Sequence, residues 1–370
     1  MKRLKTHLCY LLALLSLVAC SEVINLDINQ EGGQLIVFGR LSNSNVGNYV
    51  SVQRTGVLGK QPLPVFGAEV SITNGQGTTE LLIEGDSGIY ELPGDILVRE
   101  PGQSYVLDIR VAEKTYSTAA QVMPENYGQD FLSWELAVNT DISSAGIAIE
   151  EDVVNVYGRT EFGDLPDEFY LRWDIEEAYT YLGTFLPLNH FPLSGGQVQC
   201  FVVGDLNEQR IFLHNGKENK ATSIPNQLFA NRRVDRSFQT LHYFNLIRSS
   251  LSKEAYEYWS KLDGIVNRQG SIFDVPPAAV PGNVLAQAGD ETVLGFFEVI
   301  SVDTTRLALT RRDIPLFIFD ECEKRGEAFL ELFRVPRDCR QCLIDEGIVA
   351  PSCLLCDVLP GSSGTRPSYF

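Results

Sequence analysis

The stretch PVFGAEVSITNGQG, residues 64–77, decides the fold class that this sequence predicts. Val70 and Ile72 alternate with polar neighbours at period two, as in a strand that buries one face. Asn74-Gly75 and Gln76-Gly77 then supply consecutive turn signals. The stretch therefore predicts a β-strand that ends in a tight turn.

Outward from this strand, residues 34–124 repeat the pattern of short apolar runs separated by glycine and proline turns. Further strands are expected at residues 35–38, 50–52 and 105–111. Short strands at this spacing predict a β-sandwich of about 90 residues. The phrase from Pro64 to Ile72, followed by Gly88-Ile89-Tyr90, resembles the transthyretin-like or carboxypeptidase-regulatory-like modules of exported bacterial proteins. That resemblance implies a structural or presentational module.

Residues 125–320 form a second region that is again rich in predicted strands. These strands are expected at residues 169–175, 197–203, 210–213 and 293–302. One helix interrupts them near residues 252–266, with Ser252 as its N-cap and Glu254 in its first turn. An apolar stripe predicts that this helix packs on the sheet, and it consists of Ala255, Tyr256, Trp259, Leu262 and Val266.

Aromatic residues on this helix and on the loop after it are the leading candidates for contact with a ligand. They are Tyr256, Tyr258, Trp259 and Phe273. Aromatic rings stack on sugars or pack against peptides. The same residues at helical spacing are also typical of a buried core. The core interpretation is favoured, so no binding residue is assigned.

The N-terminus predicts an export signal and a lipid anchor. Lys2, Arg3 and Lys5 precede an apolar run from Leu8 to Ala19, which is shorter than the about 20 residues needed to span a bilayer. The run ends in Leu17-Val18-Ala19-Cys20, which satisfies a lipobox at all four positions. Acylation of Cys20 would anchor the mature chain to a membrane. Ser21, where Asp would favour inner-membrane retention in some bacteria, favours the outer membrane.

These observations predict a mainly β chain with five segments. They are a signal peptide at 1–19, a tether at 20–33, a β-sandwich domain at 34–124, a β-rich domain with one inserted helix at 125–320, and a cysteine-rich tail at 321–370. The formal net charge is −18, and loss of the three cations of residues 1–19 makes the mature charge −21. So acidic a chain argues against nucleic-acid binding.

Six cysteines remain beyond the anchor, and their even number in an exported chain favours disulfides. They are Cys200, Cys322, Cys339, Cys342, Cys353 and Cys356. The last four form two CxxC pairs, a spacing that is also typical of a zinc site. The oxidising compartment favours disulfides over zinc, and the sequence does not choose among the connectivities. We therefore assign no metal and no cofactor.

The sequence contains no convincing catalytic motif. It has no HExxH, no GxSxG elbow, no P-loop and no dinucleotide-binding glycine pattern at a strand–helix junction. His190, His214 and His242 are far apart along the chain, which favours structural roles. A glycosidase-like carboxylate pair remains open, because the chain has many acids and nothing marks two of them.

Several stretches together resemble one family, the domain of unknown function 4249 lipoproteins of Bacteroidota. They are the lipobox at Cys20, residues 35–39, 64–72, 251–259, 270–277, 281–283 and 293–297, and the ending Arg366-Pro367-Ser368-Tyr369-Phe370. Members commonly accompany SusC-like TonB-dependent transporters. The resemblance implies an outer-membrane accessory lipoprotein for nutrient capture or import, and it implies no catalytic residue.

The expected function is therefore a non-enzymatic accessory or ligand-binding partner of a TonB-dependent transporter, with an unknown ligand. The alternatives are an envelope structural or adhesive lipoprotein, and a hydrolase that uses an unrecognised carboxylate pair.

Overall fold

A computed structural model describes residues 33–56, 61–94, 96–142, 146–183, 198–207, 210–266, 280–318, 345, 347, 350–353 and 358–370. The molecule is mainly β, as the sequence predicts, and its single long described helix is α2, Lys253–Val266. The signal peptide, Cys20 and the tether up to residue 32 lie outside the described residues. None of the described helices is both long enough and apolar enough to cross a membrane.

The first third of the chain contributes ten short strands and one 3-10 turn. These are β1 (Leu35–Ser42), β2 (Tyr49–Arg54), β3 (Leu63–Pro64), β4 (Glu69–Asn74), β5 (Thr79–Leu81), β6 (Ile83–Glu84), η1 (Asp86–Gly88), β7 (Ile89–Glu91), β8 (Ser104–Val111), β9 (Lys114–Thr118) and β10 (Gln121–Val122). The predicted strand in the deciding stretch is confirmed as β4, which buries Val70 and Ile72. The turn that follows closes with a hydrogen bond from Gly77 N to Asn74 O at 2.9 Å.

The rest of the chain contributes ten further described strands, most of them longer. These are β11 (Gln129–Ile142), β12 (Ala148–Glu161), β13 (Tyr170–Gly183), β14 (Val198–Asp205), β15 (Phe212–Asn215), β16 (Ser223–Arg233), β17 (His242–Leu251), β18 (Val284–Ala286), β19 (Phe297–Leu309) and β20 (Ser362–Ser363). Two 3-10 turns, η2 (Arg236–Gln239) and η4 (Pro351–Cys353), complete the described elements.

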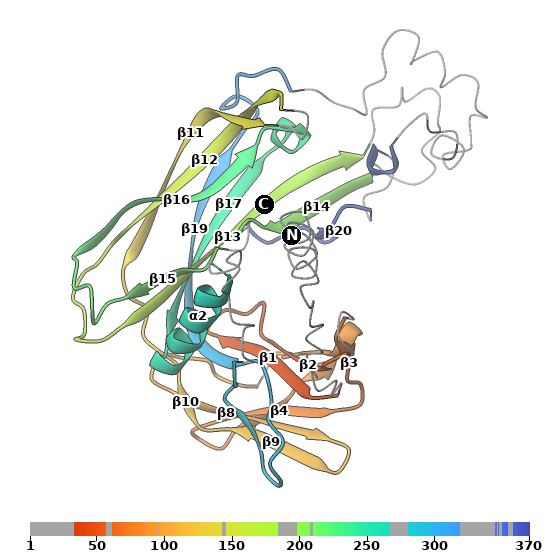
Figure 1. The fold of residues 1–370 in the computed structure, drawn as a ribbon, viewed down its shortest axis with the longest axis vertical. Coiled ribbons are helices and arrows are strands. Elements are labelled where there is room, and N and C mark those ends of the chain that lie inside the picture. Colours follow the sequence, from red (N-terminus) through yellow and green to blue (C-terminus); the bar gives the residue numbers. More distant parts are fainter. Residues whose placement is uncertain are drawn as a thin grey trace, which may run out of the picture.

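Strand β19 joins the two parts of the molecule (Figure 1). Its first residues pair in parallel with β1, where Gly39 faces Phe297, and its later residues pair antiparallel with β17. One 11-stranded sheet results, in the order β20-β14-β13-β17-β19-β1-β2-β7-β6, with β15 and β3 beside this path. Strand β18 also returns to the N-terminal region, where it pairs with β9. Strands from beyond residue 280 thus complete the sandwich that begins at residue 35.

The two largest apolar cores of the described residues lie in the two parts of the molecule. The first lies between the β1-β2-β7 part of the large sheet and the second sheet, β18-β9-β8-β4-β5, and includes Val37, Val52 and Leu107. The second lies between the third sheet, β11-β12-β16, and the inner face of β13 and β17, and includes Trp173 and Leu246. The opposite face of β13 and β17 is thereby left for other contacts.

Helix α2 packs against that opposite face. The Ser252 hydroxyl accepts a hydrogen bond from Ala255 N at 3.1 Å, which confirms the predicted N-cap. Of the predicted stripe, Ala255 is buried, whereas Tyr256 and Trp259 are partly buried. Tyr258, which the predicted stripe omits, is the most buried aromatic residue of the helix at 5% exposure. Its ring stacks on Phe296, with centroids 4.8 Å apart, because the helix lies over the start of β19.

The C-terminal residues add an edge to the large sheet. Strand β20 pairs with β14. The last two residues then pack on the outward face of β17, where the ring centroids of Tyr369 and Phe370 lie 5.5 and 4.9 Å from that of Tyr243. The aromatic ending of the sequence therefore covers part of the sheet face that α2 leaves open.

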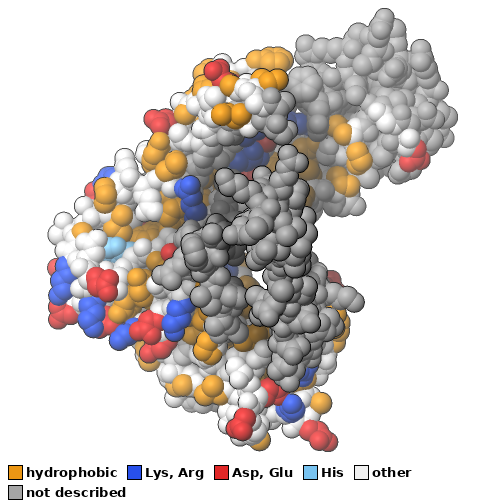
Figure 2. Space-filling model, in the orientation of Figure 1, with side chains coloured by type: hydrophobic (Ala, Val, Ile, Leu, Met, Phe, Trp, Pro, Cys, Tyr) orange, Lys and Arg blue, Asp and Glu red, His pale blue; other side chains and the backbone are white. Residues whose placement is uncertain are grey.

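The surface near β15 carries charges of both signs (Figure 2). Lys217 pairs with Glu168 at 3.2 Å, and Lys220 pairs with Asp167 at 2.8 Å. These exposed pairs contribute little stability each. They show that the acidic net charge is not spread uniformly over the described surface.

Candidate functional site

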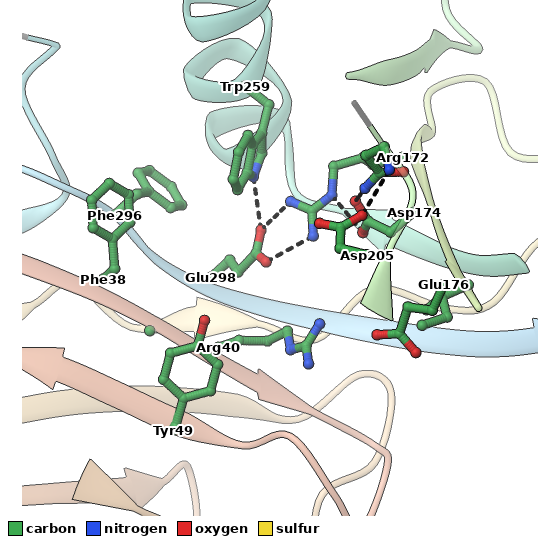
Figure 3. A pocket seen from close by; sticks show the side chains of 13 residues that line it. Phe38, Arg40, Tyr49, Arg172, Asp174, Glu176, Asp205, Trp259, Phe296 and Glu298 are labelled. Carbon is green, nitrogen blue, oxygen red and sulfur yellow. Dashed lines mark hydrogen bonds and ion pairs between the residues drawn. The ribbon is translucent and has the colours of Figure 1, made fainter. Parts of the chain in front are cut away.

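A pocket of about 320 Å³ lies where β1 and β19 meet β13, beside α2 (Figure 3). Its volume is at the lower end of the range for small-molecule sites. Four carboxylates, two guanidinium groups and four aromatic rings line it. The lining residues are Phe38, Gly39, Arg40, Tyr49, Arg172, Asp174, Glu176, Asp205, Asn207, Ile247, Trp259, Phe296 and Glu298.

The register of the strands explains why these side chains share one face. Arg40 pairs with Glu298 across the parallel ladder and with Tyr49 across the antiparallel one, so all three lie in one row. Successive residues of a strand point to opposite faces. Val37 and Leu41 therefore enter the N-terminal core while Arg40 faces the pocket.

Strand β13 follows the same rule. Trp173 and Ile175 enter the second core, whereas Arg172, Asp174 and Glu176 face the pocket. A single period-two pattern thus builds a core on one side of the strand and the polar wall of the pocket on the other.

Arg172 is the organising residue of the pocket. It is 4% exposed, and its terminal nitrogens donate to the two carboxylate oxygens of Glu298 at 2.8 and 3.0 Å. Its Nε donates to Asp174 at 3.1 Å. Burial opposes the charged form, but Glu298 and Asp174 hold the pKa of Arg172 above its ordinary value. A bidentate, buried pair of this kind is fixed in geometry.

Trp259 connects this ion pair to α2. Its Nε1 donates to Glu298 at 2.8 Å, and the guanidinium carbon of Arg172 lies 4.3 Å from the centre of its ring. The helix therefore places an aromatic ring at the pocket through one hydrogen bond and one cation–π contact.

The remaining acids are held differently. Asn207 Nδ2 donates to Asp174 at 3.1 Å, and Asn207 N donates to Asp205 at 2.8 Å. The side chain of Glu176 has no hydrogen bond or ion pair with another described residue. Burial raises the pKa of Glu176, Arg40 opposes that shift, and Asp174 and Asp205 add to it. In Figure 3 the side chains of Arg40 and Glu176 point toward one another across the pocket.

Of the four aromatic candidates in the sequence, Trp259 alone among the described residues lines the pocket. Tyr258 is core, and Tyr256 stacks on Tyr170 with centroids 4.8 Å apart. Phe273 lies outside the described residues. The preference for a core role is confirmed for Tyr258, whereas Trp259 is partly buried, packs against the same apolar cluster and also lines the pocket.

The described histidines do not come together. Burial lowers the pKa of His214, whose ring lies 5.7 Å from that of Phe169. His242 stacks on Phe238 with centroids 4.2 Å apart, and its Nε2 lies 3.2 Å from Glu177 Oε2. His190 lies outside the described residues. Among the described residues, no group of three or more histidine, cysteine or acidic side chains is arranged to hold a metal ion.

Two of the six candidate cysteines lie in the described part of the chain. Cys200 and Cys353 are buried, and both are in the disulfide-bonded state. Cys322, Cys339, Cys342 and Cys356 lie outside the described residues, so no bond is traced at both ends and the connectivity stays a prediction.

Sequence reasoning did not single out the charged residues of the pocket, although two signals mark them. Arg172 and Asp174 alternate with the core residues of β13. Glu298 is the only charge in the apolar run from Val293 to Val302. A lone charge in a buried strand requires a partner of opposite charge. This requirement was the signal in the sequence that could have identified Glu298.

Comparison with known proteins identifies the family. A search of curated proteins finds no match to this sequence. The family described as domain of unknown function, DUF4249, matches residues 21–306, which include the whole pocket. Because the match covers more than half of the chain, the protein belongs to the DUF4249 family.

Proposed function

We propose that this protein is a lipid-anchored lipoprotein of the outer membrane that acts, without catalysis, as an accessory or ligand-binding partner of a SusC-like TonB-dependent nutrient transporter. The lipobox at Cys20 supports the anchor, and Ser21 supports the outer membrane. The resemblance to lipoproteins that accompany such transporters supports the partner.

The observation that carries a binding role is the pocket at the junction of the two parts of the molecule. Arg172 engages two of its four carboxylates, Glu298 and Asp174, in fixed ion pairs. Those two acids therefore have a structural role, and the carboxylates of Glu176 and Asp205 are the ones available to bind a ligand. Aromatic side chains around such a polar floor are typical of binding sites.

Co-purification tests the proposed partnership. The full-length protein, tagged at its C-terminus, is recovered from gently solubilised outer membranes, and the recovered proteins are identified by mass spectrometry. We expect one large TonB-dependent β-barrel in stoichiometric amount. Cys20→Ala is the matched control, because it removes the acylated thiol and leaves the described fold untouched. We expect this variant not to be anchored in the outer membrane, and therefore not to co-purify with the barrel.

Repeated recovery of the wild-type lipoprotein alone, from membranes that retain intact barrels, would contradict the proposal. An unchanged nutrient uptake in a deletion strain, together with altered adhesion, would favour an envelope structural or adhesive lipoprotein instead.

A further inference from the structure

We infer that the pocket binds an organic cation, namely a guanidinium or primary ammonium group carried on an apolar arm. This inference rests on the proposed function, because it assigns a ligand class to the same pocket.

The charges that line the pocket are unbalanced. Four carboxylates face the guanidinium groups of Arg40 and Arg172, which leaves a formal charge of −2. Arg172 does not neutralise Glu176 or Asp205, because its single positive charge is already opposed by the two carboxylates of Glu298 and Asp174. Arg40 Nε donates to Gly47 O at 3.1 Å, and among the described residues Arg40 forms no ion pair.

A buried hydrogen-bond acceptor without a donor also lies beside the pocket. Glu176 pairs directly with Asn245 across the β13–β17 ladder, so the two side chains share a face. Asn245 is 2% exposed; its Nδ2 donates to the Tyr369 hydroxyl at 3.2 Å, while its Oδ1 has no hydrogen-bond partner in the described structure. Buried acceptors without donors are costly. A ligand group that carries several N–H donors and a positive charge would offset the negative charge of the lining residues and donate to Glu176 and Asp205.

The aromatic lining suits the rest of such a ligand. Phe38, Tyr49 and Trp259 border the pocket, with Phe38 and Tyr49 on neighbouring strands. Aromatic faces attract cations and also pack against alkyl chains. An anionic ligand would be repelled by the net negative charge of the pocket. A metal ion is a poorer fit than an organic cation, because the described carboxylates are not grouped as metal ligands.

Isothermal titration of the detergent-solubilised full-length protein tests this inference with matched probes. Nα-acetyl-arginine amide carries the guanidinium, Nα-acetyl-citrulline amide is its neutral isostere, and maltotriose represents a neutral sugar. We expect the arginine probe to bind about tenfold or more tightly than the citrulline probe, the effect of one charge-assisted hydrogen bond. Binding of the arginine probe should also weaken as salt concentration rises.

Three variants locate the binding. Glu176→Gln and Asp205→Asn should each weaken binding of the arginine probe by about tenfold. Glu91→Gln, on β7 of the same sheet but outside the pocket, should leave the affinity unchanged. Circular dichroism checks that each variant is folded. Because Asp205 is exposed, Asp205→Asn does not alter the packing of an apolar core.

Equal binding of the arginine and citrulline probes, binding of maltotriose alone, no binding of any probe, or unchanged affinity in both pocket variants would overturn the inference. Co-purification of the transporter reports separately on the proposed function. A barrel recovered without cation binding would reject only the ligand class, and cation binding without a barrel would reject only the partnership.

Discussion

Trp259 and Arg172 act on the same carboxylate from two elements that are far apart in sequence. The indole nitrogen of Trp259 donates to Glu298 at 2.8 Å, and Arg172, whose guanidinium carbon lies 4.3 Å from the indole ring, donates to that carboxylate as well. The contact fixes α2, β13 and β19 relative to one another. The geometry of the pocket therefore depends on one buried ion pair.

We predict that Arg172→Met destabilises the protein by about 3–5 kcal/mol, because it leaves Glu298 buried without its counter-charge. The double variant Arg172→Met/Glu298→Gln should recover part of this loss, because it removes the stranded charge as well. The free energy of unfolding from urea titration checks both. A double variant that is at least as unstable as the single one would show that the charge is not the source of the loss.

The raised pKa of Glu176 predicts a pH-dependent gain in stability for Glu176→Gln. Burial favours the protonated form of this carboxyl in the folded state, so its native pKa lies above the ordinary 4.5. Below the ordinary pKa both states are protonated and the substitution should change little. As pH rises through the native pKa, the wild type should lose stability relative to the variant.

Unfolding free energies measured between about pH 4 and pH 8 check this sign. The difference between Glu176→Gln and wild type should grow toward neutral pH and then level off. Glu91→Gln is the exposed control and should show no such growth. A difference that shrinks as pH rises would mean that the folded state stabilises ionised Glu176.

Gly295 and Gly289 provide a matched test of the junction between β1 and β19. Both have positive φ angles, +89° and +83°, so alanine is strained by about 1–2 kcal/mol at either position. A Cβ at Gly295 would also clash with the carbonyl oxygen of Val37, whereas a Cβ at Gly289 meets nothing within 4 Å. We expect Gly295→Ala to lower the melting temperature clearly more than Gly289→Ala. Equal effects would show that backbone strain alone is responsible.

The N-cap of α2 predicts that Ser252→Ala costs about 1 kcal/mol, because the Ala255 amide loses its acceptor. Ser260→Ala, on the exposed side of the same helix, should be neutral or slightly stabilising, since alanine is the better helix former. Chemical denaturation compares the two, and Ser252→Asp should retain most of the wild-type stability. An equal cost at both serines would argue against the capping role.

Local pattern was enough to predict the fold class and the helix, but not the pocket. The alternation in β4 and the cap at Ser252 are properties of a few neighbouring residues, and both predictions are confirmed. Strands β11 and β12 are not among the strands predicted individually, although Leu132, Trp134 and Leu136 of β11 alternate with polar residues as a half-buried strand requires.

The pocket depends on pairings between distant segments. Arg40 meets Glu298 only because β1 pairs in parallel with β19, and no local signal fixes that register. Arg172 and Glu298 are each recognisable as charges in apolar strands. Their partnership depends on how the large sheet bends, which the sequence pattern does not encode.

The parallel pairing of β1 with β19 has a consequence for the order in which the chain folds. Gln34 Nε2 donates to Thr292 O across a separation of 258 residues, so the ends of the folded region meet late. Closing such a long loop costs conformational entropy before the stabilising contacts have formed, and this slows folding. While the chain is synthesised from its N-terminus, the edge of β1 that pairs with β19 has no partner until β19 has been made. During that interval an unpaired edge of β1 is open to other strands, so this protein should depend on chaperones more than a chain of similar size with local pairing.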